Sequence, residues 1–235
     1  MKYSVIIPLK NEAHNILPLI DELEAVMQNF KESWELILID DGSTDNTPYL
    51  LGQVAKDKSY IRYFCFDKNY GQSSAFDAGF KKSIGEVILT LDGDGQNDPA
   101  DIPFLIKALV GADMVVGWRV ERKDSFSKRL ISRFSNFIRS RLCHDNIQDT
   151  GCSLKAYRRT SLAKIKMFDG LHRFLPALFM MEGFIVKQIP VNHRPRLVGK
   201  SNYNFFNRGF GTFIDLLAVI WMCKKSLHFR FKDDL

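Results

Sequence analysis

Residues 85–99 read GEVILTLDGDGQNDP, and this stretch decides the fold because an apolar segment runs directly into a polar loop. The segment from Val87 to Leu91 predicts a buried strand, and Asp92 and Asp94 follow it with one glycine between them. Side chains at alternate positions of an extended chain point to the same side, so the two carboxylates would face one ligand. Two carboxylates on one side repel unless a cation lies between them, which a divalent metal usually supplies. Gln96 adds a neutral oxygen for such a cation, although a solvated acidic turn is the alternative for so short a motif.

The bulk composition limits the class of protein. The chain has 235 residues, which suits one large domain or a domain with an appendage. Its 33 Lys and Arg residues exceed its 27 Asp and Glu residues by 6, and this surplus fits an anionic partner such as a phosphate ligand, a membrane surface or a nucleic acid. The cysteines are scattered without a Cys-x-x-Cys pair, which disfavours a disulfide framework or a structural zinc site and favours reduced cytoplasmic thiols: Cys65, Cys143, Cys152 and Cys223.

We expect neither a signal peptide before the first strand nor a membrane-spanning helix. The longest apolar candidate, Phe210 to Cys223, is interrupted by polar residues and is shorter than the ~20 residues that a span needs. The expected location is therefore in solution or at a membrane surface.

Apolar periodicity over the first 117 residues alternates between strands and helices. Strands are expected at Tyr3–Leu9, Trp34–Ile39, Tyr60–Phe66, Glu86–Leu91 and Ala112–Gly117. Helices are expected from Ile16 to Phe30, from Thr47 onward, and at Gln72–Ser83 and Pro99–Val110. This alternation predicts a parallel sheet with helices on both faces. Ligands bind such sheets outside the carboxyl ends of the strands, where four polar loops would meet: Pro8–Glu12, Asp40–Ser43, Lys68–Gly71 and Asp92–Gln96.

The regular alternation ends after Gly117. A basic segment with helical spacing follows from Trp118 to Arg141. Further strands are expected at Cys152–Tyr157 and Phe184–Val191, and a polar, basic loop at His193–Asn204. A final helix with a long apolar face and a basic end is expected at Phe205–Lys225.

Several short motifs occur in a fixed order along nearly the whole chain. They are VIIPLKNE at 5–12, IDDGSTDNT at 39–47, KNYGQ at 68–72, LDGDGQNDP at 91–99, GWR at 117–119 with Arg122, Ser132-Arg133 with Asn136, DTGCS at 149–153, and Arg196 with GKSNY at 199–203. Together they are specific, and the chain resembles the family 2 glycosyltransferases of the GT-A fold. Within that family it is similar to the polyprenyl-phosphate branch, which includes the dolichol-phosphate mannose synthases.

The resemblance implies an α/β fold of the GT-A type, with a mostly parallel central sheet flanked by helices. It implies a glycosyltransferase domain over residues 1–204, with a nucleotide-sugar half at about 1–117 and an acceptor half at about 118–204, followed by an amphipathic helical tail at 205–235. The implied reaction is a metal-dependent, inverting transfer of a hexose-type sugar from a UDP- or GDP-linked donor to undecaprenyl or dolichyl phosphate.

The resemblance also assigns candidate site residues. The nucleotide sugar would contact Pro8, Asn11, Glu12, Asp40, Asp41, Asn69, Asp92 and Gly93. Gly93 would in addition let a bulky ligand approach the backbone. Mg²⁺ or Mn²⁺ would be held against the diphosphate by Asp92, Asp94 and Gln96, as Lewis-acid help at the bond being broken.

A phosphate acceptor is already anionic at pH 7, so it needs cations more than a strong base. The candidates for binding it are Arg119, Arg122, Arg133, Arg196 and Lys200, with a hydroxyl contact from Ser201. Asp94, Asp149 and Arg119 are the candidate catalytic residues, and Asp149 would act as a base or would orient the acceptor or an arginine. The histidines show no ligand spacing and are interpreted as structural or surface residues: His14, His144, His172, His193 and His228.

The segment from Phe205 to Phe231 has two interpretations, a helix packed on the domain or an interfacial helix on anionic lipid. With a lipid-linked acceptor, the second places the protein peripherally on the cytoplasmic face of the membrane. Many members of the branch carry transmembrane helices after this point, so a separate membrane partner is left open as a means of anchoring. A homo-oligomer is left open as well.

Other function classes are less well supported. A family 2 enzyme with a soluble or glycan acceptor is the nearest alternative. A Rossmann dehydrogenase is disfavoured because no Gly-x-Gly-x-x-Gly follows a strand. A non-catalytic scaffold or basic nucleic-acid binder is a different class of answer, and the intact Asp92, Asp94 and Gln96 set argues against it, so we expect no nucleic-acid partner.

Overall fold

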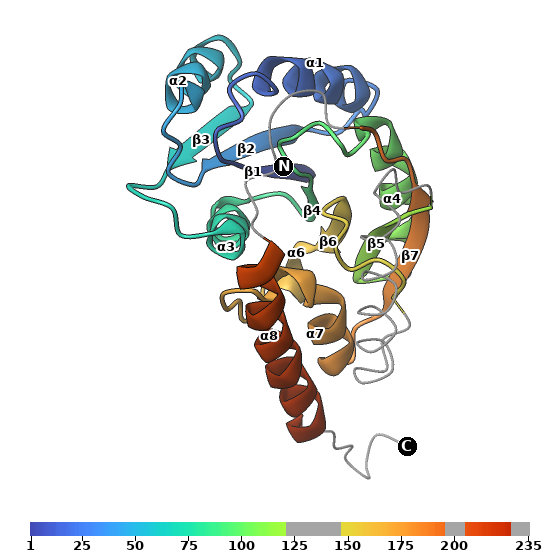
Figure 1. Cartoon of the computed structure of the whole chain (residues 1–235). Helices are drawn as coiled ribbons and strands as arrows, with labels where there is room; N and C mark the ends of the chain where they lie inside the picture. Colours follow the sequence, from blue (N-terminus) through green and yellow to red (C-terminus); the bar gives the residue numbers. More distant parts are fainter. Residues whose placement is uncertain (121–146, 196–204, 227–235) are drawn as a thin grey trace.

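The computed structural model describes residues 1–120, 147–195 and 205–226 (Figure 1). Its strands are β1 (Tyr3–Leu9), β2 (Trp34–Asp40), β3 (Ile61–Cys65), β4 (Val87–Thr90), β5 (Met114–Arg119), β6 (Lys155–Arg158) and β7 (Val186–Val191). Its helices are α1 (Ile16–Met27), α2 (Thr47–Asp57), α3 (Gln72–Lys82), α4 (Ile102–Ala108), α6 (Arg159–Leu162), α7 (Leu175–Met181) and α8 (Phe205–Lys225), with 3₁₀ turns η1 (Pro99–Asp101) and η2 (Leu171–Arg173).

The strands form one seven-stranded sheet in the order β3-β2-β1-β4-β6-β5-β7. β6 runs antiparallel to both of its neighbours, β4 and β5, whereas the other pairs in the sheet are parallel. The expected mostly parallel sheet is therefore confirmed, and its one reversed strand is contributed by residues that lie far from β4 and β5 in the sequence.

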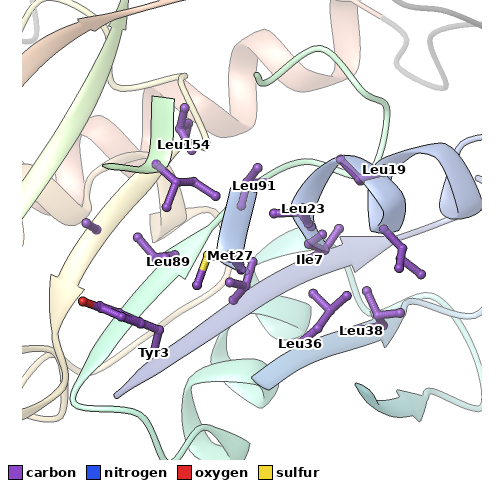
Figure 2. Close-up of a cluster of buried hydrophobic side chains, with 14 of the residues drawn as sticks. Tyr3, Ile7, Leu19, Leu23, Met27, Leu36, Leu38, Leu89, Leu91 and Leu154 are labelled. Atoms are coloured by element: carbon purple, nitrogen blue, oxygen red, sulfur yellow. The ribbon is translucent and has the colours of Figure 1, made fainter. Parts of the chain in front are cut away.

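Both faces of the sheet are buried along its central strands β1, β2 and β4, which explains the continuous apolar runs of these strands. Along β1, Val5 and Ile7 belong to the core cluster on one face, and Ile6 belongs to the cluster on the other. The first cluster packs the sheet against α1, where Leu23 and Met27 are fully buried (Figure 2). The second cluster packs the opposite face against α3 and α7.

Several sequence-based boundaries differ from the structure. The helix expected from Pro99 to Val110 begins as the 3₁₀ turn η1, where the Asp98 carboxylate accepts a hydrogen bond from the Ala100 N–H, and α4 ends at Ala108. The helix expected to reach Phe30 ends at Met27, and the Phe30 ring instead packs on Tyr3 from the following turn. The strand expected from Cys152 begins at Lys155, because residues 150–153 line a cavity.

α8 packs one side against α7 and η2 and leaves the other side exposed (Figure 1). Val219 is fully buried in a cluster with Leu171, Phe174, Ala177 and Leu178. The opposite stripe of α8 is at least half exposed and consists of large apolar residues: Phe213, Ile214, Leu217 and Trp221. Among the described residues, no helix is both long and apolar enough to span a membrane.

Candidate active site

One cavity of about 650 Å³ lies at the carboxyl ends of the parallel strands. The four polar loops expected at this edge all contribute to it. Their lining residues are Pro8, Leu9, Lys10 and Glu12 after β1, Asp41 after β2, Asn69, Gly71 and Gln72 before and within α3, and Asp92, Gly93, Asp94 and Gln96 after β4. The opposite wall comes from the loop before β6 and from η2, and it contains Thr150, Gly151, Cys152, Ser153, Lys155, His172 and Arg173.

The loop after β4, which we call the acidic loop (residues 92–98), places two carboxylates in the cavity. The Asp92 carboxylate accepts a hydrogen bond from the Gln72 side-chain amide at 2.8 Å, and the Asp94 carboxylate accepts one from the Gln96 main-chain N–H at 3.1 Å. Burial raises the pKa of Asp92, and the nearby negative charge of Asp94 raises it further. A cation between the two groups would relieve this repulsion.

The acidic loop fits a hard divalent cation such as Mg²⁺ or Mn²⁺. Asp92 and Asp94 supply carboxylate oxygens and Gln96 supplies an amide, all of them lining one cavity. No group of three or more His, Cys, Asp or Glu side chains suited to a metal occurs within the described ranges. A partial protein donor set of this kind is typical of Mg²⁺ sites that are completed by substrate phosphates and water.

Packing against the end of β1 requires glycine at position 93. A Cβ atom at Gly93 would lie 2.4 Å from Cδ2 of Leu9 and 3.2 Å from the carbonyl oxygen of Pro8. The missing side chain therefore faces the end of β1, and Gly93 also lines the cavity, so its expected contact with a ligand stays a prediction. Gly95 in the same loop has φ of +72°, a left-handed conformation that favours glycine, and it lets the chain turn back after Asp94.

Asp41 organises the wall formed by the β3–α3 loop. It is 5% exposed, and its carboxylate accepts hydrogen bonds from the Asn69 side-chain amide at 2.5 Å and from the Tyr70 and Gly71 N–H groups at 2.7 and 3.0 Å. Burial raises the pKa of Asp41, and the two main-chain donors oppose that rise. Asp41 thus fixes the position of Asn69, which lines the cavity beside it.

Two residues expected to contact the nucleotide sugar do not line the cavity. Asp40 is 1% exposed, and its carboxylate accepts hydrogen bonds from the main chain and the hydroxyl of Ser43. Asn11 has φ of +56° and accepts a hydrogen bond from the Thr44 N–H at 2.8 Å. Both side chains stabilise the loop after β2, a local role that the sequence motif does not distinguish from ligand binding.

Arg119 and Asp149 form a buried bidentate ion pair behind the cavity wall. Arg119 Nε and Nη2 lie 2.6 and 2.9 Å from the two carboxylate oxygens of Asp149. Burial lowers the pKa of Arg119, but its pairing with Asp149 outweighs burial and raises that pKa overall. Neither residue lines the cavity, although a Cβ at Gly151, which does, would lie 3.2 Å from Arg119 Nη2. Of the roles considered for Asp149, the geometry supports the orientation of an arginine.

The opposite wall contains polar residues that the sequence motifs do not assign to the site, among them Lys155 and His172. Lys155 is 4% exposed, and its ammonium donates to the main-chain carbonyls of Thr150 at 3.3 Å and His172 at 3.5 Å. His172, interpreted from the sequence as a structural or surface residue, lines the cavity. Its Nδ1 lies 2.6 Å from the Ser73 hydroxyl. Burial keeps the pKa of His172 well below its usual value. Side-chain alternation from Ser153 could have identified Lys155, whereas His172 carries no local signal.

The chain leaving β7 is held against the acidic loop. Asn97 and His193 form a β-bridge, and the Arg194 N–H donates to the Gln96 carbonyl at 2.9 Å. The Arg194 guanidinium forms ion pairs with Glu22 of α1 at 2.6 Å and with Asp98 at 2.7 Å. We call these contacts the Arg194 clamp. The remaining acceptor-site candidates fall outside the described residues: Arg122, Arg133, Arg196, Lys200 and Ser201.

Solved structures with similar folds include glycosyltransferases. Glucosyl-3-phosphoglycerate synthase from Mycobacterium tuberculosis, in complex with Mn²⁺ and UDP-glucose, matches with a TM-score of 0.70 and 18% identity over 95% of this chain and 79% of that chain. A mannosyltransferase from Pyrobaculum calidifontis, in complex with GDP-mannose and Mn²⁺, matches with a TM-score of 0.69 and 20% identity over 92% of this chain and 63% of that chain. At this identity, the matches establish the GT-A fold.

Two sequence relatives share a higher percentage of identical residues with this chain than these two solved structures do. Dodecaprenyl-phosphate galacturonate synthase from Rhizobium johnstonii is 35% identical over 230 residues, which are 95% of this chain and 68% of the relative. Undecaprenyl-phosphate 4-deoxy-4-formamido-L-arabinose transferase from Pectobacterium carotovorum subsp. carotovorum is 37% identical over 204 residues, which are 86% of this chain and 62% of the relative. The chain therefore spans roughly two thirds of the length of these relatives. Residues 4–166 match the family described as glycosyl transferase family 2, and the chain belongs to that family.

Proposed function

We propose that the chain transfers a sugar from a nucleotide sugar to a polyprenyl phosphate, with inversion at the anomeric carbon. The observation that carries this proposal is the acidic loop with Asp92 and Asp94, placed in one cavity with the loops after β1 and β2. Both of the sequence relatives described above are named as transferases or synthases that use polyprenyl phosphates. A nucleotide sugar and a lipid phosphate are the substrates that these features favour.

In this proposal an oxygen of the acceptor phosphate attacks the anomeric carbon, and the bond from that carbon to the nucleoside diphosphate breaks. Asp92, Asp94 and Gln96 would hold Mg²⁺ or Mn²⁺, which supplies Lewis-acid stabilisation of the leaving diphosphate when it is bound. Asp41 and Asn69 maintain the wall on the nucleotide side. Asp149 pairs with Arg119 through both carboxylate oxygens, and this suits an acceptor that is already ionised and needs no strong base.

The exposed stripe of α8 supports a peripheral membrane location on the cytoplasmic face. Leu171 and Phe174 pack against Val219 of α8, and they flank His172 and Arg173 of the cavity wall. The packed side of α8 therefore lies next to η2 of the cavity wall, and the exposed stripe faces away from η2. Exposed Lys224 and Lys225 lie in the last turn of the helix. Large apolar side chains next to lysines are typical of helices that bind anionic lipid surfaces.

A radiolabel transfer assay tests the proposal. Purified protein with Mn²⁺ or Mg²⁺ and undecaprenyl phosphate in detergent is offered labelled UDP-glucose, UDP-N-acetylglucosamine, UDP-galacturonate and GDP-mannose in turn. We expect label from one donor to enter the organic phase, and a chelator to abolish the transfer. Label that appears only in a water-soluble glycan or small molecule would contradict the lipid acceptor, and metal-independent transfer would contradict the role of the acidic loop.

A further inference from the structure

Lys155 is a buried cation in the cavity wall, and the proposed mechanism assigns no role to it. It opens β6, where it pairs in register with Thr90 at the end of β4 and with Val116 of β5. Only 4% of the residue is exposed, yet it lines the cavity. Its partner Thr90 lies two residues before Asp92. Lys155 is therefore located between the acidic loop and the wall of residues 150–153.

The hydrogen-bonding capacity of the Lys155 ammonium group is only partly used by the described residues. An ammonium group carries three N–H donors, and the partners of Lys155 are two main-chain carbonyls at the long distances of 3.3 and 3.5 Å. Lys155 makes no ion pair with any carboxylate in the part of the chain that the structure describes. Taking an unpaired ammonium out of water is costly, and burial accordingly lowers the pKa of Lys155 to about 8.

The neighbouring carboxylates are committed to other partners. Both oxygens of Asp149 accept hydrogen bonds from Arg119, and Asp92 accepts one from Gln72 while it faces the proposed metal position. A structural link between the Thr150 and His172 carbonyls would need only neutral donors. The positive charge is therefore explained best by an anion that enters the cavity.

We propose that Lys155 is a substrate-binding residue whose remaining N–H donates to a phosphate oxygen in the cavity. The phosphate belongs to the donor diphosphate or to the lipid acceptor, and this inference rests on the proposed function only for the choice between them. Lysine binds phosphate as a compact point charge, and such a charge-assisted hydrogen bond strengthens as water is excluded from the cavity.

Two substitutions separate charge from structure. Lys155→Gln keeps an amide that can donate to both carbonyls but lacks the charge, and Lys155→Met removes both. Lys56→Met, at an exposed position on α2, is the matched control. Calorimetry measures the affinity of each protein for UDP and GDP with Mn²⁺, and separately for a short-chain polyprenyl monophosphate in detergent.

We expect both Lys155 variants, but not the control, to lose at least about tenfold affinity for one of these ligands, which names the source of the phosphate. We also expect Lys155→Met to have a higher Tm than wild type, because it removes the burial cost, whereas a structural role predicts a lower Tm. If Lys155→Met does not fold, the affinities of Lys155→Gln decide.

Lys155→Gln with wild-type affinity for both ligands overturns the inference, and so does a wild-type protein that binds neither. If the wild-type protein binds these ligands but transfers no sugar, the proposed function is contradicted. The role of Lys155 is then decided by the measured affinities alone.

Discussion

At the scale of single residues, Asp92 and Asp94 are central because their carboxylates would bind the metal. Burial raises the pKa of Asp92 and the negative charge of Asp94 raises it further, so the two carboxylates interact unfavourably unless a divalent cation binds between them. A loop with this property contributes little to stability by itself. Its acidic residues are better explained by ligand binding than by folding.

We predict that Asp94→Asn lowers sugar transfer by roughly 100-fold or more, because it removes several kcal/mol of stabilisation at the leaving diphosphate. The Tm should stay equal to that of wild type or rise slightly, because the substitution removes a like charge beside Asp92. Transfer rates and thermal melts test this, with the exposed Asp21→Asn on α1 as control. Wild-type transfer by a folded Asp94→Asn protein would remove Asp94 from the metal site.

The lowered pKa of Lys155 predicts a pH-dependent stability difference. Its pKa is about 8 in the folded protein and 10.5 ordinarily, so between these values the unfolded chain binds more protons and unfolding becomes less favourable as pH rises. Below pH 8 the burial cost is fully present, about 3 kcal/mol for this shift. Lys155→Met should therefore exceed wild type in unfolding free energy at pH 7, and the difference should shrink by pH 10. Urea denaturation at several pH values measures it, and a constant difference would contradict the pKa shift.

Among the structural elements, the end of β7 couples two parts of the site. The Arg194 clamp ties the chain that continues toward Arg196 and Lys200 to the acidic loop and to α1. Its ion pairs are partly exposed, so their effect on stability is small. We expect a larger effect on substrate binding, because the main chain continues from Arg194 into residues proposed to bind the acceptor, Arg196 and Lys200.

Arg194→Ala should therefore change stability by less than about 1 kcal/mol. It should raise KM for the lipid phosphate more than KM for the nucleotide sugar, because the segment after Arg194 carries the expected acceptor residues. Steady-state kinetics with each substrate varied in turn measures both constants, and Lys187→Ala, elsewhere on β7, is the control. A larger change in the donor KM would place the clamp on the nucleotide side instead.

The exposed apolar stripe of α8 leads to a separate prediction about membrane binding. Leu217→Glu or Trp221→Glu should weaken co-sedimentation with anionic vesicles by about tenfold, because each removes a large apolar side chain from the proposed interface. Val110→Glu, at an exposed apolar position after α4, should leave binding unchanged. Equal vesicle binding by wild type and both α8 variants would favour the interpretation of α8 as a helix that only packs on the domain.

Across the whole molecule, the sequence predicts the first five strands well because each is an apolar run bounded by polar loops. α7 was missed because Leu175 to Phe179 are buried on all sides and show no amphipathic period. The loops at the strand ends could be predicted from strand direction alone. Lys155 and His172 could not, because they reach the cavity through the insertion of β6 and the packing of η2, which depend on contacts between distant segments.

The position of β6 also has a consequence for how the chain acquires its structure during synthesis. β5 hydrogen-bonds in the sheet with β6 and β7, both of which are translated later. A nascent chain that ends after β5 thus lacks the partners of three strand edges, one on β4 and both on β5, and such edges invite aggregation. We expect a fragment of residues 1–119 to be digested rapidly by protease, while the complete chain resists. The wall opposite the acidic loop includes His172 and Arg173, so the cavity should be complete only after residue 173 has left the ribosome.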